Sequence, residues 1–251
     1  MLALAWKSLR NRLGTALLTA FTIALSVALV LGVQRIRSEA RASFASTVSG
    51  TDLIVGARSS PVGLLLYAVF HLDDATNNVS WQSYQEIAAW PEVAWSVPIS
   101  LGDSHRGFRV MGTTADFFAH YRYGARHPLE FSAGKPFDDV YDAVLGAEVA
   151  RKLGYSLGSA IVLTHGTGRI GNADHKDKPF RIVGILARTG TPIDATVAVG
   201  LAGIEAIHVD WQSGTQIPGH TVSADAARRM DLTPKTITAF LLGLKSRIAT
   251  F

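Results

Sequence analysis

Residues 10–40 read RNRLGTALLTAFTIALSVALVLGVQRIRSEA, and no charged residue lies between Arg12 and Arg35. A helix rises about 1.5 Å per residue, so Leu13–Gln34 would extend over roughly 30 Å, the thickness of the hydrocarbon core of a bilayer. Six Leu, three Val, one Ile and one Phe lie in this run. Each favours membrane insertion by about 0.5 kcal/mol near the centre of a helix. The stretch predicts a transmembrane helix over residues 13–34.

Two alternatives compete with a retained membrane span. A cleaved signal peptide would share the basic start, but its apolar region is about 7–15 residues long and ends in small residues at a cleavage site. This run is longer and ends in VQRIR at residues 33–37. A core helix of a soluble domain would show a polar face, whereas few polar residues interrupt the run, namely Thr15, Thr19, Thr22 and Ser26. Their near-helical spacing suggests a weakly polar stripe that faces another helix, and we expect a membrane anchor.

Basic residues flank both ends of the predicted span, so the positive-inside rule decides its orientation only weakly. More than two hundred residues follow the span, and long domains translocate largely regardless of charge. We therefore expect a cytoplasmic amino terminus and an extracytoplasmic main domain. Residues 1–12 alternate apolar and basic side chains, which is typical of a short interfacial helix with Trp6 at the level of the headgroups.

The basic composition belongs to the flanks of the predicted span. The net charge is +4, but residues 1–41 hold six Lys and Arg against one acidic residue, Glu39. The rest holds eighteen basic against nineteen acidic residues, so nucleic-acid binding is not expected. The absence of cysteine excludes disulfides, thiol catalysis and Cys-based zinc sites.

The part of the chain after the span alternates short strand patterns with short helix patterns. This predicts an α+β extracytoplasmic domain, or two small ones, anchored by the single amino-terminal helix. An outward extension of the span is expected over residues 35–50, and Gly154 is expected to close a short helix in the left-handed conformation. The expected strands are 51–56, 94–99, 108–112, 142–145, 159–164, 179–186, 195–199 and 236–246, and the expected further helices are 81–90, 147–153 and 201–211.

A second apolar stretch, SPVGLLLYAVFHL at residues 60–72, is too short to span a bilayer. One interpretation is a buried helix. The other is a surface that contacts lipid or a partner protein, formed by Leu64, Leu65, Tyr67 and Phe70. The sequence leaves both open.

Three motifs that would indicate catalysis or nucleotide binding lack their required context. Residues 166–171 match G-x-G-x-x-G, but no helix pattern follows to bind a pyrophosphate. Residues 154–158 match G-x-S-x-G around Ser156, but the order of elements is helix, turn, strand rather than strand, turn, helix. No Walker A motif occurs. We expect no catalytic residue and no cofactor in this chain.

Several histidines and acids near residue 170 are candidate metal ligands, although their spacing matches no known metal motif and solvated loop side chains are the expected outcome. The residues are His165, Asp174 and His175, with Asp177 and His208 as further members. They support an alternative function, a membrane-anchored periplasmic binding module that handles a metal ion. A secreted hydrolase built on Ser156 is a third hypothesis, which the missing strand-to-helix turn disfavours.

Six short segments occur in an order and spacing that resemble the permease subunits of MacB/FtsX-type ABC transporters, over essentially the whole chain. They are AWKSLR at 5–10, DLIV at 52–55, VMGT at 110–113, GKPF at 134–137, VLG at 144–146 leading through Val149, Ala150, Leu153 and Gly154 to Gly158, and FRIVGIL at 180–186.

This resemblance implies a bacterial inner-membrane permease with four spans, of which three would follow residue 251. Residues 1–12 would be cytoplasmic or interfacial, 13–34 the first span, and 35–251 a MacB-like periplasmic domain. It implies a homodimer and a separate cytoplasmic ATPase that binds the ATP and drives the periplasmic domain by mechanotransmission, for export, extraction or regulation of a cargo. Trp6, Lys7 and Arg10 would lie in the coupling region, and membrane lipid and a periplasmic protein or lipoprotein would be further partners.

Overall fold

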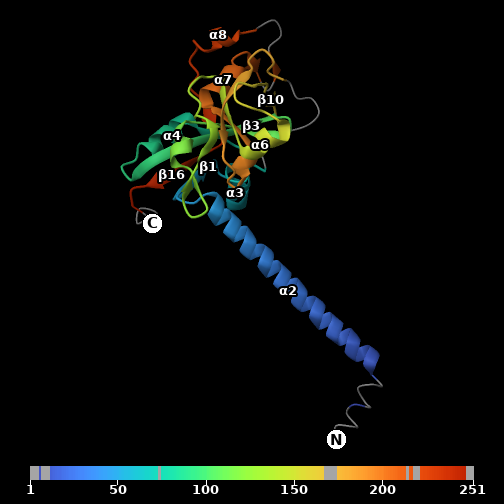
Figure 1. The fold of residues 1–251 in the computed structure, drawn as a ribbon. Coiled ribbons are helices and arrows are strands. Elements are labelled where there is room, and N and C mark those ends of the chain that lie inside the picture. The colour runs from blue at the N-terminus through green and yellow to red at the C-terminus, as the bar shows by residue number, and fades with distance from the viewer. Residues whose placement is uncertain are drawn as a thin grey trace. The chain divides into compact units, whose positions relative to one another are not determined.

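The computed structural model describes Trp6 and residues 12–72, 75–166, 174–212, 215–216 and 221–246. The chain divides into two compact units, Met1–Ala45 and Ser46–Phe251 (Figure 1). Trp6 is helical and exposed, whereas Lys7 and Arg10 lie outside the described residues.

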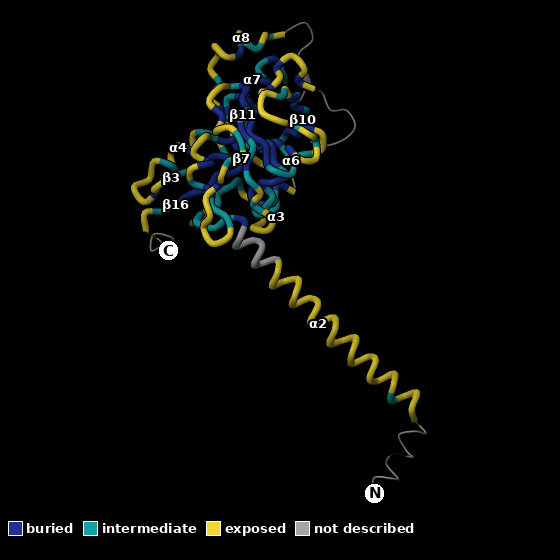
Figure 2. Tube along the Cα trace, in the orientation of Figure 1, coloured by how far each residue is buried: buried dark blue, intermediate teal, exposed yellow. Residues whose placement is uncertain are grey.

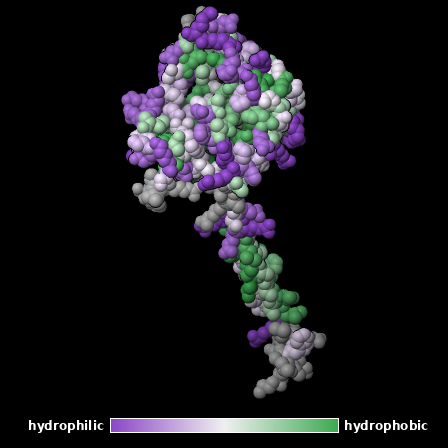
Figure 3. Space-filling model, turned by 60° about the vertical axis from the view of Figure 1, so that its left-hand side comes forward, coloured by the Kyte–Doolittle hydropathy of each residue, from purple (hydrophilic) through white to green (hydrophobic). Residues whose placement is uncertain are grey.

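Helix α2 runs without a break from Leu13 to Thr47, and all of it except the last two residues belongs to the first unit. Its portion Leu13–Glu39, 27 residues with a mean hydropathy of 2.4, is long and apolar enough to cross a membrane. The side chains of this portion are almost all exposed, and an apolar stretch is bounded by hydrophilic residues (Figures 2 and 3). The helix expected at residues 13–34 is therefore confirmed as an apolar helix, and none of the described residues of its unit buries it.

Three hydroxyl groups of α2 form hydrogen bonds within the helix, which suits a helix in lipid. Thr19, Thr22 and Ser26 each donate to the carbonyl oxygen four residues earlier, at 2.8–2.9 Å. Three of the four side chains of the expected polar stripe are thus satisfied within the helix itself, and its contact with another helix stays a prediction.

The second unit is built on a mixed sheet in the order β1-β16-β3-β4-β12-β8-β11-β7. β12 is parallel to β4 and β11 is parallel to β8, and the other pairings along this order are antiparallel. These strands are β1 Leu53–Gly56, β3 Val93–His105, β4 Phe108–Thr113, β7 Phe131–Gly134, β8 Asp142–Leu145, β11 Phe180–Leu186, β12 Thr196–Gly200 and β16 Ala239–Leu244. The shorter strands are β2 Val79–Ser80, β5 Arg122–Tyr123, β6 His127–Pro128, β9 Ala160–Ile161, β10 Thr164–His165, β13 Trp211–Gln212, β14 Thr215–Gln216 and β15 Thr236–Ile237.

Side chains of the central strands alternate between two cores because successive residues of a strand face opposite sides of a sheet. Ala143 and Leu145 of β8 enter one core, whereas Val144 between them enters the other. The first core also takes residues of α6 (Ala147–Leu153) and α7 (Leu201–His208), and the second takes Phe117 and Phe118 of α5 (Asp116–His120). The sheet is therefore covered on both faces, and the expected α+β class is confirmed.

The remaining helices are α3 Pro61–Ala68, α4 Trp81–Ala88, the 3-10 turn η1 Pro192–Ala195 and α8 Ala224–Ala227. Helix α3 corresponds to the apolar stretch at residues 60–72, and Tyr67 is buried in a small core with Ala68 and Ala239. Tyr67 is therefore a core residue, and its expected place on a partner or lipid surface is wrong. Leu64, Leu65 and Phe70 are partly exposed, so a contact surface there stays a prediction.

Local signals in the sequence locate most elements, including the left-handed Gly154 that ends α6 with a φ of 68°. Three expected strands differ in extent. The strand expected at 236–246 is two strands, of which β15 pairs with β2 and β16 pairs with β1 and β3. The strand expected at 159–164 is two short strands that pair with different partners, β9 with β11 and β10 with β3. The strand expected at 94–99 continues to His105 as β3, across a shift of register between Leu101 and Ser104.

Candidate metal-ligand cluster

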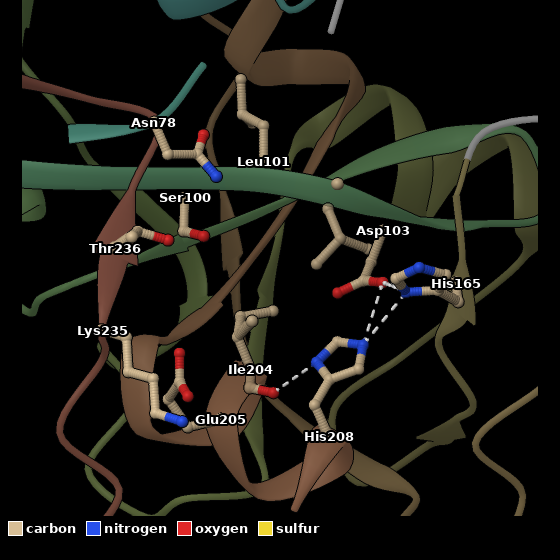
Figure 4. Close-up of a pocket in the computed structure, with 12 residues that line it drawn as sticks. Asn78, Ser100, Leu101, Asp103, His165, Ile204, Glu205, His208, Lys235 and Thr236 are labelled. Carbon is tan, nitrogen blue, oxygen red and sulfur yellow. Dashed lines mark hydrogen bonds and ion pairs between the residues drawn. The ribbon is translucent and has the colours of Figure 1, made fainter. Parts of the chain in front are cut away.

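Four side chains from distant parts of the sequence meet at one end of β3. Asp103, His165, His175 and His208 each present a possible metal-ligand atom, and the four atoms all lie within 4.8 Å of one another. We call this group the metal-ligand cluster. Figure 4 shows three of its members, Asp103, His165 and His208, with their side chains converging.

Strand pairing positions the first two members. β10 runs antiparallel to β3, and His165 stands directly opposite Asp103 in the register. Opposed residues of an antiparallel pair project their side chains on the same face, a few ångströms apart. His165 Nδ1 accordingly lies 3.3 Å from Asp103 Oδ1.

His208 enters the cluster from the last turn of α7. Its Nδ1 lies 2.8 Å from the carbonyl oxygen of Ile204, one turn earlier. A carbonyl accepts only, so Nδ1 carries the proton, and in the neutral ring the lone pair is on Nε2. That Nε2 lies 3.1 Å from His165 Nδ1 and 3.7 Å from Asp103 Oδ1. The carbonyl of Ile204 thus turns the unprotonated nitrogen of His208 toward the other members.

His175 completes the cluster from the segment that pairs with β10. Asp174 forms an isolated bridge with Thr164, and the backbone N–H of His175 donates to the carbonyl of Leu163 at 2.9 Å. The side chain is fully buried, and neither ring nitrogen has a hydrogen-bond partner. Its ring packs against that of Trp211, with 4.3 Å between centroids.

The surroundings shift the pKa values of His175 and His165 in opposite directions. Burial lowers the pKa of His175 to about 4, assisted by the neighbouring His208 ring. The carboxylate of Asp103 raises the pKa of His165 through its close contact with the ring, against a smaller opposing effect of burial. His175 is therefore neutral at physiological pH and has a lone pair to donate, while His165 has a compensating negative charge beside it.

A cavity of about 380 Å³ adjoins the cluster (Figure 4). Asp103, His165 and His208 form part of its wall, and Glu205 and Lys235 line it further out. Burial raises the pKa of Glu205, an effect that the positive charge of Lys235 partly offsets. The cavity gives a small ion or ligand a route to three of the four donor atoms.

A second buried polar group lies close by in the sequence, and its buried basic side chain has hydrogen-bond partners, unlike that of His175. The fully buried Lys178 Nζ donates to both carboxylate oxygens of Asp210 at 3.0 Å and to Asp177 Oδ2 at 2.5 Å. Burial alone would raise the pKa of Asp210, but the N–H of Val222 and the Lys178 ammonium together hold it below its usual value. We call Lys178, Asp177 and Asp210 the lysine cluster.

The structure brings together three of the five candidate ligands named from the sequence, and Asp177 belongs to the lysine cluster instead. His165, His175 and His208 meet, but Asp174 accepts a hydrogen bond from Thr164 Oγ1 at 2.9 Å and lies 3.6 Å from Lys176 Nζ instead. Asp103 takes the place expected of Asp174. Sequence reasoning missed Asp103 because it lies 62 positions before its partner His165, and only the pairing of β3 with β10 joins them.

The G-x-S-x-G motif lies in a turn, and most of the G-x-G-x-x-G motif lies outside the described residues. Ser156 lies between α6 and β9, and its backbone N–H points to the hydroxyl of Ser159 at 3.3 Å, as in a turn. Most of the G-x-G-x-x-G stretch, residues 167–171, lies outside the described residues.

A model of the MacB-like periplasmic core domain matches residues 16–238. A search among curated proteins found no match. Among solved structures, the periplasmic region of MacB from Actinobacillus actinomycetemcomitans is 10% identical, with a TM-score of 0.46 over 82% of this chain and 84% of that chain. The extracellular domain of the noncanonic ABC-type transporter YknZ from Gram-positive bacteria is also 10% identical, with a TM-score of 0.41 over 77% and 84%. A domain of a putative permease protein from Porphyromonas gingivalis is 14% identical, with a TM-score of 0.36 over 69% and 64%.

Proposed function

This chain belongs to the family of the MacB-like periplasmic core domain, and on that basis we propose that it couples ATP hydrolysis on a separate cytoplasmic subunit to conformational change in its own periplasmic domain. Family membership and the apolar helix make it a membrane-anchored protein of the ABC-type permease family with a periplasmic domain. The coupling, its direction and its cargo are the proposal.

The observation that best supports coupling is the way α2 continues into the domain. The helix has no break over 35 residues, and its last residue, Thr47, already belongs to the domain by its contacts. The buried hydroxyl of Tyr121 donates to the carbonyl oxygen of Thr47, and the N–H of Ser49 donates to that of Arg122 at 3.0 Å. The residues at the end of α2 are therefore bonded within the domain, and in this proposal they receive the movement of the helix.

The segment that follows α2 is hydrogen-bonded to strand β16 of the sheet. The N–H of Asp52 donates to the carbonyl of Leu242 in β16 at 2.9 Å, and the carboxylate of Asp52 accepts from the N–H of Leu244 at the same distance. β16 in turn pairs with β3 along six residues. Asp52 thus joins the segment that follows α2 to β16 and, through β16, to β3.

Within this proposal the amino-terminal residues Trp6, Lys7 and Arg10 lie at the cytoplasmic membrane surface and contact the ATPase, which binds the ATP. The protein works as a homodimer in the inner membrane, with three further spans beyond residue 251. The partly exposed Leu64, Leu65 and Phe70 contact lipid or a periplasmic protein or lipoprotein.

Isolation of the assembly tests the coupling. The tagged chain, taken from its native membrane in mild detergent, should bring with it an ATPase that carries a Walker A motif. Reconstitution of the pair in nanodiscs should raise the ATPase rate above that of the ATPase alone. The double variant Lys7→Glu, Arg10→Glu should lose this stimulation, whereas Lys176→Glu, an exposed charge in the periplasmic domain, should keep it. Recovery of the chain without an ATPase would contradict the proposal.

The orientation can be tested separately because the chain has no cysteine. A single cysteine at Ala125, an exposed position of the domain, should react with a membrane-impermeant maleimide in cells with a permeabilised outer membrane. A cysteine at Ser8 should react only after the inner membrane is opened. The reverse pattern would place the domain in the cytoplasm.

A further inference from the structure

We propose that Asp103, His165, His175 and His208 form a binding site for a single Zn²⁺ ion in the periplasmic domain. This site goes beyond the transport proposal and does not depend on it.

The spacing of the donor atoms fits a tetrahedral ion. Zinc binds imidazole nitrogen at about 2.0–2.1 Å and carboxylate oxygen at about 2.0–2.2 Å, so the edges of a zinc tetrahedron are about 3.3 Å. The three distances among His165 Nδ1, His208 Nε2 and Asp103 Oδ1 are 3.1, 3.3 and 3.7 Å. These three atoms already form one face of such a tetrahedron, and the His175 nitrogen lies within 4.8 Å of each of them.

The unpartnered ring of His175 is the second, independent observation. A buried polar atom without a hydrogen bond is destabilising, and such atoms are rare in native proteins. His175 has two of them, with no exposed surface, in a segment whose backbone is fixed by bonds to β10 and Leu163. An ion held between the four side chains gives one nitrogen its missing partner.

The surrounding contacts hold two of the ligands ready for a metal. Histidine ligands are usually oriented by a hydrogen bond from the other ring nitrogen to a carbonyl or carboxylate. The bond from His208 Nδ1 to Ile204 O has this form and turns Nε2 toward His165 and Asp103. Antiparallel pairing of β10 with β3 holds Asp103 directly opposite His165, so both side chains can reach one ion.

The type of donor selects the ion. Three imidazole nitrogens and one carboxylate oxygen suit zinc and its divalent neighbours, whereas Ca²⁺ and Mg²⁺ prefer oxygen ligands and Cu⁺ prefers sulfur. Four protein ligands complete a tetrahedron, as in zinc sites that bind or stabilise rather than catalyse. Entry and release are possible from the adjoining cavity, where the His165 side chain is 39% exposed.

Bound zinc would connect parts of the domain that the chain joins only distantly. The ligands come from β3, β10, the end of α7 and the segment that follows residue 173. The ion therefore links the far end of β3 to α7, and its loss would loosen one end of the sheet.

Zinc binding by the chain in detergent, stripped with a chelator, is the direct test. Competition with a chromophoric zinc chelator should give one tight site per chain. Asp103→Asn and His165→Ala should each weaken binding by about 100-fold or more, because each removes a ligand. His127→Ala, an exposed histidine of β6, is the matched control and should bind as tightly as the unchanged chain.

Cobalt provides a second readout that is independent of affinity. Co²⁺ in the site should show the intense visible bands of a tetrahedral complex and quench part of the tryptophan fluorescence, since the Trp211 ring lies beside His175 and His208. Trp211→Phe should keep the bands and lose that part of the quenching. Circular dichroism of each stripped variant checks that it is folded, and the partly exposed His165 remains testable if His175→Ala fails to fold.

Three outcomes would overturn the proposal. They are no zinc bound at micromolar concentration, zinc bound equally by Asp103→Asn and His165→Ala while both are folded, and cobalt spectra of an octahedral complex. The ATPase experiment is unaffected by any of these results.

Discussion

The lysine cluster and the metal-ligand cluster both combine buried basic side chains with carboxylates, but they differ in whether the buried basic group has hydrogen-bond partners. In the lysine cluster, the ammonium of Lys178 has acceptors in Asp177 and Asp210, and Asp210 also receives the N–H of Val222. In the metal-ligand cluster, His175 is equally buried and both of its ring nitrogens lack a partner. His208 and Asp210 are only two residues apart, so the same segment serves both groups.

The difference shows how a structural site can be told from a binding site. Folding tends to satisfy buried polar atoms, because each unsatisfied one costs about 1–3 kcal/mol. A buried group whose polar atoms all have hydrogen-bond partners within the protein has a structural explanation. A group that places three imidazoles and a carboxylate together and still leaves nitrogens unsatisfied has a place for a ligand.

The largest effect is expected from breaking the lysine cluster. Lys178→Met leaves the buried carboxylate of Asp210 without its cation, and the free energy of unfolding should fall by about 3–5 kcal/mol. Denaturant unfolding measures the loss. The double variant Lys178→Met, Asp210→Leu should recover most of it, since an apolar pair can replace a buried ion pair. A single variant as stable as the unchanged chain would show that the cluster is not structural.

His71 is a buried histidine with a partner, and it gives a pH-dependent comparison with His175. Its Nδ1 lies 3.0 Å from Thr196 Oγ1, and burial, with the charge of Arg109, lowers its pKa to about 4. The unfolded chain binds the proton near 6.5, so this contribution is present above pH 6.5 and is lost as the pH falls toward 4. The loss should reach about 3 kcal/mol.

Unfolding midpoints between pH 4 and 7 measure this effect against His71→Gln, which keeps a polar group for Thr196 but cannot be protonated. The variant should show a flatter pH profile. Parallel profiles for the two proteins would mean that His71 is protonated equally easily in both states.

Zinc should change stability only through the metal-ligand cluster. At a free zinc concentration of about 100 times the dissociation constant, the melting temperature should rise by about 5–10 °C, since the ion binds the folded state. Thermal unfolding with and without zinc measures the rise. Asp103→Asn should not respond, while Lys178→Met should melt at a lower temperature yet show a similar rise. An equal rise in Asp103→Asn would place the ion elsewhere.

The smallest effect is expected at Asp174, which borders the metal-ligand cluster without belonging to it. Asp174→Asn should change zinc affinity by no more than about twofold, as for a surface substitution. A large loss in the competition assay would make Asp174 a ligand and would remove the distinction between it and Asp103.

The sequence predicts the features that depend on neighbouring residues. The span of α2 follows from a long apolar run without charges. The core strand β8 follows from a short apolar segment typical of a strand buried on both faces, and β11 from a short apolar segment in which buried and less buried residues alternate. Gly154 ends α6 because only glycine adopts its left-handed conformation without strain. These signals are local, so a reading along the chain finds them.

Features that depend on strand pairing cannot be read in this way. The order of the sheet places β8 between β12 and β11, which no local pattern specifies. The last six of the thirteen residues of β3, SLGDSH, are mostly polar and include glycine, so they are more typical of a turn than of a strand. That segment carries Asp103. The sequence therefore indicates the histidines of the metal-ligand cluster but not its carboxylate ligand.

X-ray absorption at the zinc edge tests the central claim, that the metal-ligand cluster is a binding site where the lysine cluster is structural. The zinc-loaded chain should show four nitrogen or oxygen neighbours at about 2.0–2.1 Å, with outer-shell scattering from three imidazole rings. A shell of six oxygen atoms, or a spectrum unchanged in His208→Ala, would contradict it.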